Sequence, residues 1–300
     1  MVENQEKIKE NQIKEKNIKL IIHLYYIKMN CCICGPVKNC GPYLKKVLAN
    51  IEKIGSLFDD YKIVIYYDKS RDNTLDILKQ YQLINPKFLF YVNQERVSPF
   101  RTHNIAKGRN FCLNYIKQNL QEFPYFIMMD FDDVNCKECN PDIIKKYLTE
   151  DYINRWDGLS FNTSPKYYDI WGLSIWPYCF SYNHFENNVQ FYTIIQDYVT
   201  SLLNKLPPNG LLPCISSFNG FSIYKTSMFL KTYYDGRIRK DLIPPENMTA
   251  HSNATGSKLV YKKYVTVDGK FEDCEHRAFH IQARQNSGAK IMISPEVLFS

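Results

Sequence analysis

The sequence predicts an α/β fold in which helices cover both faces of a mostly parallel central sheet. Three observations support this prediction. Strand-like and helix-like segments alternate through the first 150 residues, acidic residues follow two of the strand-like segments, and the second half of the chain is rich in aromatic residues. The 300 residues, of which 45% are hydrophobic, are enough for one large domain with a full core.

The charge and the cysteine content narrow the class of protein. A net charge of +7 suits an anionic small substrate, and the 38 lysines and arginines are scattered along the chain, which argues against a nucleic-acid partner. Ten cysteines are present, and Cys136 and Cys139 form a lone Cys-x-x-Cys pair. A zinc site would need a clear second pair, so we expect free thiols in a reducing compartment and keep zinc as the alternative.

The N-terminal residues differ from the rest of the chain. Residues 1–19 are mainly Lys, Glu, Asn and Gln and predict a flexible charged arm. The apolar run at 18–27 is too short to span a bilayer and is interrupted by Lys19 and His23. No signal-peptide cleavage pattern follows it. We therefore expect a soluble cytoplasmic protein without a transmembrane segment.

Residues 20–150 are predicted to form the first half of the α/β domain. The segment Lys-Ile-Val-Ile-Tyr-Tyr is β-branched and aromatic, which is typical of a central strand. Gly35 and Pro36 are expected to break the first strand, and Gly55 to end the first helix in a left-handed conformation. In chain order, the predicted elements are a strand ending at 33, a helix at 43–54, a strand at 62–67, a helix starting near 72, a strand at 88–92, a helix at 105–120, a strand at 125–129 and a short helix at 141–149.

Residues 151–300 are predicted to form the second half of the same domain. The stretch 156–224 is dense in Trp, Tyr, Phe, Pro, Asn and Gly with little periodicity, which predicts short strands and long loops along one wall of a cleft. The remaining predicted elements are an exposed, mobile loop at 235–270, a helix at 272–287 ended by Gly288, and a last strand at 290–294.

Carboxylates stand at the ends of two predicted strands. The run Tyr-Phe-Ile-Met-Met is followed by Asp130, Asp132 and Asp133, and an earlier strand is followed by Asp68. Open α/β sheets bind ligands at the carboxyl ends of their strands, and Mg²⁺ and Mn²⁺ prefer carboxylate and phosphate oxygens. The pattern predicts a metal–phosphate site at that edge of the sheet. For Asp-x-Asp alone, an acidic turn whose side chains only cap the backbone is the alternative.

Three further charged residues could take part in such a site. Arg101 and Arg109 lie between the two acidic strand ends and could make bidentate contacts to a diphosphate, although Arg109 could equally be a surface charge on its helix. Asp72 could join Asp68 at the ligand, or it could cap the helix that follows.

A last candidate group lies near the C-terminus, in the run Cys-Glu-His-Arg-Ala-Phe-His. His276 and His280 are four residues apart on a predicted helix and therefore share a face. Either could complete a metal shell begun by Asp132, or both could be surface residues of a capped helix.

These motifs together resemble one enzyme family. Asp68-x-Ser70-x-Asp72 after a strand, Arg109-Asn110 on a helix, and a strand ending in Asp-x-Asp resemble the nucleotide-sugar glycosyltransferases of the GT-A fold, a Rossmann-like α/β architecture. This resemblance implies a nucleotide-sugar-binding first half and an acceptor-binding second half of one domain.

A narrower resemblance rests on three short motifs in the second half. Residues 168–171, 218–221 and 274–276 resemble the capsule-type α-mannosyltransferase-like group and related uncharacterised proteins of large DNA viruses. A host-cytoplasm or virion location would follow from this. The group more often has an arginine a few positions after its Asp-x-Trp, whereas Ser174 and Ile175 follow here, so the acceptor contacts cannot be carried over.

The resemblance to GT-A enzymes implies roles for the acidic residues. Asp68 and Asp72 would hold the nucleoside, Asp130 would face the ribose beside the metal, and Asp132 would bind Mn²⁺ or Mg²⁺. The extra acid Asp133 could be the ligand instead. A C-terminal histidine often gives a further ligand in the family, which here would be His276 or His280.

The implied reaction moves a hexose from a nucleoside-diphosphate sugar to a glycan or other hydroxyl acceptor. If the reaction inverts configuration, Glu275 or Asp169 is a candidate base for the acceptor hydroxyl. If it retains configuration, the leaving phosphate can take that proton and no protein base is needed. Trp171 and Trp176 would offer flat faces to sugar rings, or they would belong to ordinary core packing.

Two other functions fit parts of the sequence. Asp130-Phe-Asp132-Asp-Val134 also matches the nucleophile pattern of haloacid-dehalogenase-like phosphatases, in which Asp130 would be phosphorylated. That motif normally opens the chain, and a late pair of metal-binding acids is missing here. A non-catalytic carbohydrate-binding protein, with structural acids, is the second alternative.

Overall fold

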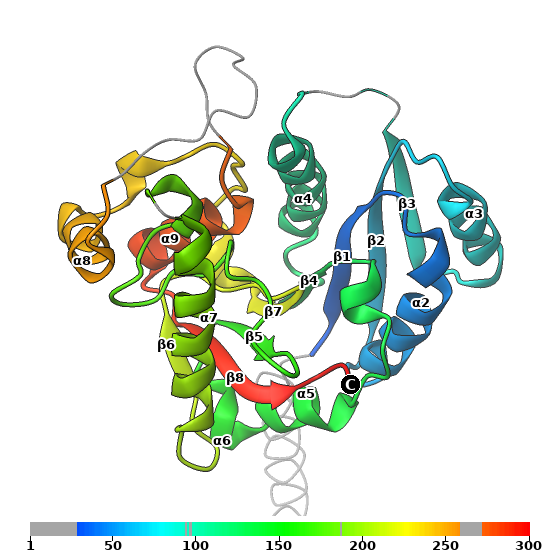
Figure 1. Ribbon diagram of the computed structural model, residues 1–300. Helices are drawn as coiled ribbons and strands as arrows, with labels where there is room; N and C mark the ends of the chain where they lie inside the picture. Colours follow the sequence, from blue (N-terminus) through cyan, green and yellow to red (C-terminus); the bar gives the residue numbers. More distant parts are fainter. Residues whose placement is uncertain (1–28, 94, 96–97, 187, 259–271) are drawn as a thin grey trace, which may run out of the picture.

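The computed structural model describes residues 29–93, 95, 98–186, 188–258 and 272–300 (Figure 1). The predicted N-terminal arm, the apolar run that follows it and part of the predicted loop at 235–270 therefore lie outside the described residues. None of the helices within these ranges combines the length and the apolar character that a bilayer crossing requires.

The described chain folds around an eight-stranded mixed sheet with the strand order β3-β2-β1-β4-β7-β5-β8-β6. The first four of these strands are mutually parallel, β7 is antiparallel to both of its neighbours, β5 and β8 are parallel, and β6 is antiparallel to β8. The strands are β1 (Cys31–Val37), β2 (Tyr61–Asp68), β3 (Phe88–Asn93), β4 (Tyr125–Met129), β5 (Gly158–Asn162), β6 (Leu212–Cys214), β7 (Phe221–Lys225) and β8 (Ile291–Val297).

Helices cover both faces of the sheet, as predicted. Alternate residues of β1 show the two faces, because Cys31 and Ile33 belong to one hydrophobic core and Cys32 and Cys34 to the other. The first core also contains buried residues of α2, α3 and α5, and the second those of α4, α7 and α9. The helices are α2 (Gly41–Gly55), α3 (Thr74–Ile84), α4 (Arg101–Gln118), α5 (Pro141–Tyr147), α6 (Glu150–Ile153), α7 (Asn188–Asn204), α8 (Pro245–Thr255) and α9 (Glu275–Ser287).

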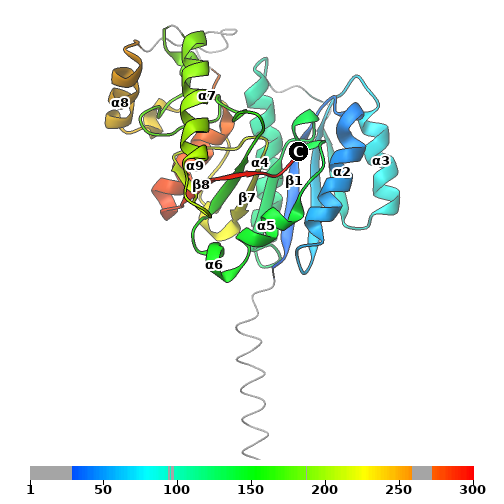
Figure 2. The same ribbon diagram turned by 60° about the horizontal axis from the view of Figure 1, so that its bottom comes forward.

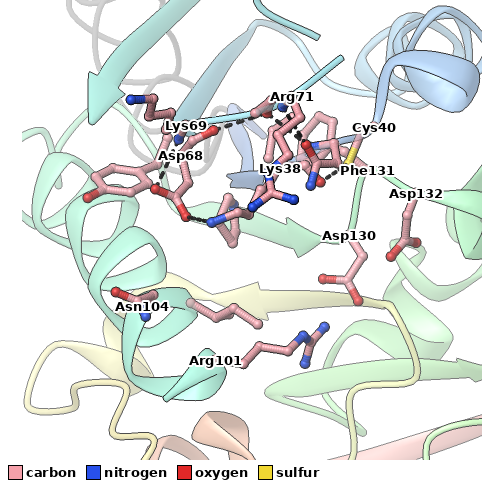
Figure 3. Close-up of a pocket in the computed structure, with 16 residues that line it drawn as sticks. Lys38, Cys40, Asp68, Lys69, Arg71, Arg101, Asn104, Asp130, Phe131 and Asp132 are labelled. Carbon is pink, nitrogen blue, oxygen red and sulfur yellow. Dashed lines mark hydrogen bonds and ion pairs between the residues drawn. The ribbon is translucent and has the colours of Figure 1, made fainter. Parts of the chain in front are cut away.

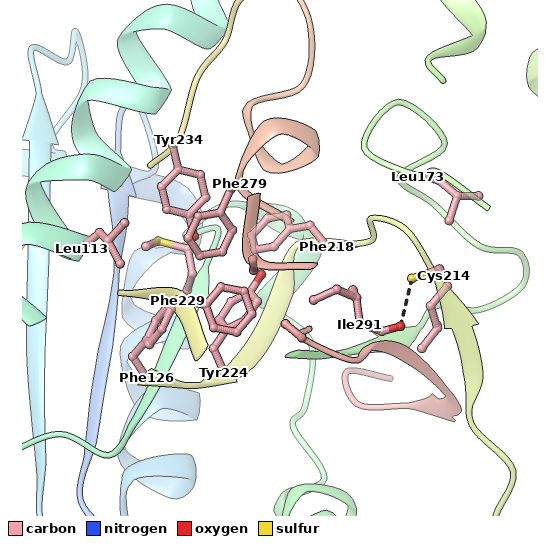
Figure 4. Close-up of a cluster of buried hydrophobic side chains, with 14 of the residues drawn as sticks. Leu113, Phe126, Leu173, Cys214, Phe218, Tyr224, Phe229, Tyr234, Phe279 and Ile291 are labelled. Atoms are coloured by element: carbon pink, nitrogen blue, oxygen red, sulfur yellow. Dashed lines mark hydrogen bonds between the residues drawn. The ribbon is translucent and has the colours of Figure 1, made fainter. Parts of the chain in front are cut away.

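Stacked aromatic rings join the two halves of the domain (Figure 4). Phe126 of β4 stacks on Tyr224 of β7 at 4.8 Å between ring centroids. Phe279 of α9 stacks on Phe229 at 5.0 Å and on Tyr234 at 4.1 Å. These contacts fix α9 against the middle of the sheet, so the residues at its N-terminus have a defined position relative to β4.

The C-terminus closes the second half onto the first. The Ser300 N–H donates to the carbonyl of Glu138 at 3.0 Å, and the Asn140 N–H donates to that of Leu298 at 2.9 Å. The end of the chain therefore lies beside the segment that leads into α5 (Figure 2).

Two glycine-based expectations for the first half are wrong. β1 continues through Gly35 and Pro36 to Val37, and its pairing with β4 ends at Cys34, before the proline. Gly35 permits close packing, since a Cβ there would lie 2.2 Å from the carbonyl oxygen of Met129. Gly55 is the last residue of α2 and not a left-handed cap; a Cβ on it would meet the ring of Tyr61 at 2.7 Å. The predicted left-handed Gly288 after α9 is confirmed, with φ 66°.

Among the helices of the second half that were not predicted are α7 and α8. α7 lies within the aromatic stretch, and its Phe191, Ile195 and Val199 form a buried helical face at spacings of four. The many other aromatic residues of that stretch obscured this helical periodicity in the sequence. α8 lies within the predicted loop at 235–270; its single fully buried residue is His251, so it carries almost no apolar pattern.

Candidate active site

A cleft of about 990 Å³ opens at the carboxyl ends of β1, β2 and β4 (Figure 3). The acids Asp68, Asp130 and Asp132 line it, together with Arg101 at the start of α4. The structure therefore brings the two acidic strand ends to one edge of the sheet. The other charged and polar side chains of the lining are Lys38, Asn39, Lys69, Ser70, Arg71 and Asn104.

Asn39 ties together the loops after β1 and β2. Its N–H donates to the Ser70 hydroxyl at 2.9 Å, and its side-chain oxygen accepts from the Arg71 N–H at 2.8 Å. Asn39 has a φ of 53°, a conformation that asparagine tolerates better than most residues. The two loops thus form one wall of the cleft before any ligand arrives.

Asp72 is a capping residue and not part of the cleft lining. Its carboxylate accepts from the Gly41 N–H at 2.9 Å, and from the Thr74 N–H and hydroxyl at 3.1 and 2.6 Å. These bonds cap the first turns of α2 and α3. Burial alone would raise the pKa of Asp72, but the bonds from Thr74 and Gly41 outweigh it and lower that pKa. The structure supports the capping alternative, and a role of Asp72 at the nucleoside stays a prediction.

Asp68 ends β2 and is paired with Lys38, which sequence reasoning missed. The Lys38 Nζ lies 2.6 Å from one carboxylate oxygen, and the other accepts from the Lys69 N–H at 3.0 Å and the Asn93 amide at 3.1 Å. Lys38 is half-exposed and follows a strand that was expected to end earlier. The corrected course of β1 is the signal that places Lys38 in the cleft.

Arg109 lies in a buried ion-pair network beneath the cleft. Its guanidinium donates to Asp130 and to Glu275, each at 2.8 Å, while only 3% of the side chain is exposed. Burial would lower the pKa of Arg109, but the charges of Asp130 and Glu275 outweigh it and raise that pKa. Arg109 is therefore neither the expected diphosphate contact nor a surface charge. It joins α4, the end of β4 and the first turn of α9.

The turn after β4 crowds two carboxylates together. The amide of Asn135 donates to the carbonyls of Asp130 and Gly220 at 2.8 and 2.7 Å, which fixes the turn. Burial raises the pKa of Asp132 to about 6, and the charges of Asp130 and Asp133 act in the same direction, against the bond from Val134. A divalent cation would offset this crowding, so Asp132 and the free oxygen of Asp130 fit a metal that also binds phosphate. Asp133 is exposed and lies outside the cleft lining.

The model of one protein family matches residues 32–202, which is more than half of the chain and includes Asp68, Asp130 and Asp132. The chain belongs to glycosyl transferase family 2. Its mixed sheet, flanked by helices, is the GT-A-like α/β fold that the sequence motifs implied. A search of proteins with curated descriptions finds no match.

Solved structures similar to this family-2 chain include TarS from S. aureus and a mannosyltransferase from Pyrobaculum calidifontis. The TarS 1–349 structure with UDP-GlcNAc has 14% sequence identity and a TM-score of 0.45, over 90% of this chain and 57% of that one. The mannosyltransferase PcManGT, solved with GDP-Man and Mn²⁺, has 12% identity and a TM-score of 0.39, over 85% of this chain and 60% of that one. The chain thus spans less than two thirds of either.

The family match gives no support to the phosphatase alternative, and Asp130, its would-be nucleophile, is bonded to Arg109. The narrower likeness to the capsule-type α-mannosyltransferase-like group and to proteins of large DNA viruses stays a prediction.

In this family-2 chain, neither histidine of α9 reaches the acidic edge. The ring nitrogens of His280 bond the hydroxyls of Ser216 and Tyr224 at 2.9 and 3.0 Å. Burial lowers the pKa of His280 to about 3, so the ring is neutral at pH 7. His276 stacks on Phe218 at 3.6 Å and is 1% exposed. Its Nε2 lies 3.5 Å from Glu275, and neither ring nitrogen has a hydrogen-bond partner among the described residues.

The expected metal shell, in which His276 or His280 would join Asp132, is therefore not assembled. Within residues 29–300, apart from the gaps given above, no three His, Cys, Asp or Glu side chains come together as a metal-binding group. The zinc alternative for Cys136 and Cys139 finds no support either, because neither belongs to such a group within these residues. None of the ten cysteines is in a disulfide, as expected. A cation at Asp132 would need ligand oxygens from a bound phosphate, which is the usual arrangement for Mg²⁺.

Asp169 lies on the loop after β5, close enough to Asp130 for the two charges to interact. Its N–H donates to the side chain of Asn219 at 2.9 Å, and one carboxylate oxygen accepts from the Gly172 N–H at 2.9 Å. Burial raises the pKa of Asp169 to about 6; the bond from Gly172 opposes this, and the charges of Asp130 and Glu275 add to it. Asp169 is thus a half-buried carboxylate with a pKa close to neutral.

Proposed function

We propose that this protein is a metal-dependent glycosyltransferase that moves a hexose from a nucleoside-diphosphate sugar to a hydroxyl acceptor such as a glycan. The observation that carries the proposal is the single cleft that joins Asp68 to Asp130 and Asp132. One elongated, doubly anionic ligand could contact both acidic strand ends, with a cation between its phosphates and Asp132. The family match supports the same class of reaction.

Within this proposal, residues 20–150 carry the donor site and residues 151–300 the acceptor site. Asp68 and the loops tied by Asn39 hold the nucleoside. Arg101 faces the cleft and makes no hydrogen bond or ion pair within the described residues, so its guanidinium is available to a diphosphate. Mn²⁺ or Mg²⁺, held by Asp132 and Asp130, supplies charge neutralisation for the leaving diphosphate.

The electrostatics favour Asp169 over Glu275 as the base of an inverting reaction. Glu275 is 4% exposed and one of its oxygens is bonded to Arg109, so it is poorly accessible to an acceptor hydroxyl. Asp169 has a pKa of about 6, well placed to take a proton near neutral pH. We therefore assign Glu275 the positioning of Arg109 and Asp130. A retaining reaction would need neither base.

A cytoplasmic location is part of the proposal and is supported by the free thiols. None of the ten cysteines is in a disulfide, which is usual where the surroundings are reducing. A location in host cytoplasm or in a virion would further require the viral kinship, which stays a prediction.

A donor panel tests the proposed function. We expect UDP- and GDP-sugars with Mn²⁺ or Mg²⁺ to raise the melting temperature of the purified protein and to be hydrolysed slowly by it. Both effects should be lost in Asp132→Asn. Asp133→Asn is the matched control, because Asp133 is adjacent, exposed and outside the cleft. Glycan binding without donor binding or metal dependence would instead favour the carbohydrate-binding alternative.

A further inference from the structure

Two aromatic rings are exposed on the loop that carries Asp169. Tyr168 is 54% exposed and Trp176 is 60% exposed, although aromatic side chains of this size are usually covered. Trp171, which lies between them in the sequence, is half-buried, and its buried indole N–H has no hydrogen-bond partner within the described part of the chain. The sequence had paired Trp171 with Trp176 as flat faces for sugars. The structure presents Tyr168 and Trp176 instead.

Tyr168 stands beside the acidic edge of the sheet. Its N–H donates to the side chain of Asn219 at 3.2 Å, and the carbonyl of the next residue, Gly220, accepts from the Asp130 N–H at 2.8 Å. Burial raises the pKa of Tyr168 to about 12, with contributions from the charges of Asp169, Asp132 and Asp130. The ring is therefore a neutral phenol close to these carboxylates, where the proposed function places the acceptor hydroxyl.

Trp176 is held further along the same loop. The carbonyl of Tyr168 accepts from the hydroxyl of Tyr192 at 3.4 Å, and the carbonyl of Trp176 accepts from that of Tyr198 at 3.0 Å. Both tyrosines belong to α7 and are six residues apart, a rise of about 9 Å along the helix. The backbone of Trp176 is thus anchored more than one helical turn along α7 from that of Tyr168.

Buried bonds hold the loop between the two rings. The guanidinium of Arg277, 2% exposed, donates to the carbonyl of Leu173 at 2.9 Å, to the Ser174 hydroxyl and to the carbonyl of Trp171. The Ser174 N–H donates to the carbonyl of Ser216 at 2.8 Å. The rings are therefore presented by a fixed backbone, which reduces the ordering entropy that a ligand must overcome.

We infer that Tyr168 and Trp176 are two stacking platforms of an extended acceptor site, and that the acceptor is an oligosaccharide. The inference rests on the proposed function and names the class of its second substrate. A sugar ring has an apolar face whose C–H groups suit the negative face of an aromatic ring, while the phenol and indole edges can bond its hydroxyls. The reacting sugar stacks on Tyr168, and a preceding sugar stacks on Trp176.

A protein or lipid partner fits this surface less well. A stable protein interface buries about 800 Å² on each partner around a continuous apolar centre, whereas these rings are separated by a segment fixed from below. The position of Tyr168 beside the acids also ties this surface to the reaction. Ile194, another exposed apolar residue, lies on α7 and has no link to the acidic edge, so it provides a matched control.

The test compares acceptors of increasing length. The probes are gluco-, manno-, galacto- and N-acetylglucosamine oligosaccharides of one to six units, with UDP-GlcNAc and GDP-Man as donors. We expect kcat/KM for the accepted series to rise at least tenfold from one unit to three. Trp176→Ala should bring that ratio toward one, and Tyr168→Ala should lower kcat/KM for every acceptor at least tenfold. Tyr168→Phe should restore most of the loss, and Ile194→Ala should match the wild type.

A binding measurement gives a readout that does not need turnover. The protein has three tryptophans, and Trp156 is fully buried, so an oligosaccharide that stacks on Trp176 should change the fluorescence. The change should disappear in Trp176→Phe. Donor hydrolysis without any oligosaccharide transfer or fluorescence change would overturn the inference and leave the proposed function standing. Absence of donor hydrolysis in the wild type would overturn both.

Discussion

Charged residues have opposite roles at the open edge of the sheet, which includes Lys38 and Arg101, and in the buried charge layer beneath it, which includes Arg109 and Arg277. At the edge, Lys38 and Arg101 are exposed or half-exposed, and Arg101 has no partner within the described residues. In the layer, Arg109 and Arg277 are 3% and 2% exposed and each is paired with carboxylates. The charged side chains at the edge are available to bind a charged ligand. The buried ion pairs of the layer instead fix the loops and helix ends that surround the cleft.

We therefore expect the loss of a charge at the edge to weaken ligand binding, and the loss of a charge in the buried layer to lower the stability of the fold. Removal of one partner of a buried pair leaves an uncompensated charge and costs about 3–5 kcal/mol. Exposed pairs contribute about 0–1 kcal/mol. The following predictions test the distinction, from the largest expected effect to the smallest.

Asp132→Asn should lower transfer and donor hydrolysis by roughly 10²–10³-fold, the loss typical of one group that stabilises transition-state charge. The same change should leave the free protein as stable or more stable, because it removes a crowded carboxylate whose pKa is raised to about 6. Rate assays and thermal unfolding at pH 7 measure the two effects. Equal rate losses in Asp132→Asn and the control Asp133→Asn would contradict the assignment.

Arg109→Met should lower the free energy of unfolding by about 3–5 kcal/mol, because Asp130 and Glu275 would lose their shared cation. Arg101→Met should change stability by less than about 0.5 kcal/mol and instead weaken donor binding. Urea unfolding and donor titration of both variants measure the contrast. Similar stabilities for the two variants would show that the layer is not a structural network.

The pH dependence of transfer, measured at saturating metal so that Asp132 stays ionised, should report Asp169 if the reaction inverts. A base must be ionised, so kcat/KM should be at its full value above the pKa of about 6 and fall with unit slope as pH drops through it. The raised pKa also makes the folded state bind a proton more readily than the unfolded chain, so this group lowers stability as pH rises from about 4 to 6. The acidic limb should be absent from the residual activity of Asp169→Asn; an unchanged limb would rule Asp169 out.

Lys38→Met should have the smallest effect. Its ion pair with Asp68 is half-exposed, so the change in unfolding free energy should stay below about 1 kcal/mol. Donor affinity should fall a few-fold at low salt, and the difference should shrink at high salt because exposed charges are screened. Calorimetric titration of UDP and GDP at two salt concentrations measures this. A loss that is independent of salt would point to a buried role for Lys38.

Much of the fold could be predicted because its signals are local. A few residues are enough to predict the β-branched strand Tyr61–Asp68 and the acidic end of β4, and Gly288 marks the end of α9. α8 could not be found from its apolar residues, since one buried histidine has no period. The course of β1 through Pro36 depends on where its pairing with β4 stops, which no local pattern shows.

The candidate site could likewise be predicted only in part from the sequence. The meeting of Asp68, Asp130 and Asp132 follows from parallel strands sharing one edge, so the sequence could predict it. The positions of Arg109 and His280 could not be predicted, because each depends on partners more than fifty residues away. An arginine near a helix start looks the same in sequence whether it faces a diphosphate or a buried glutamate.

The most direct test of the central claim is a crystal structure with a nucleoside diphosphate and Mn²⁺. We expect the base and ribose against Asp68 and the loop of Asn39, and the diphosphate with its cation at Asp132 and Arg101. A nucleotide bound outside this cleft, or bound with its phosphates at Asp68 and nothing at Asp132, would contradict the account.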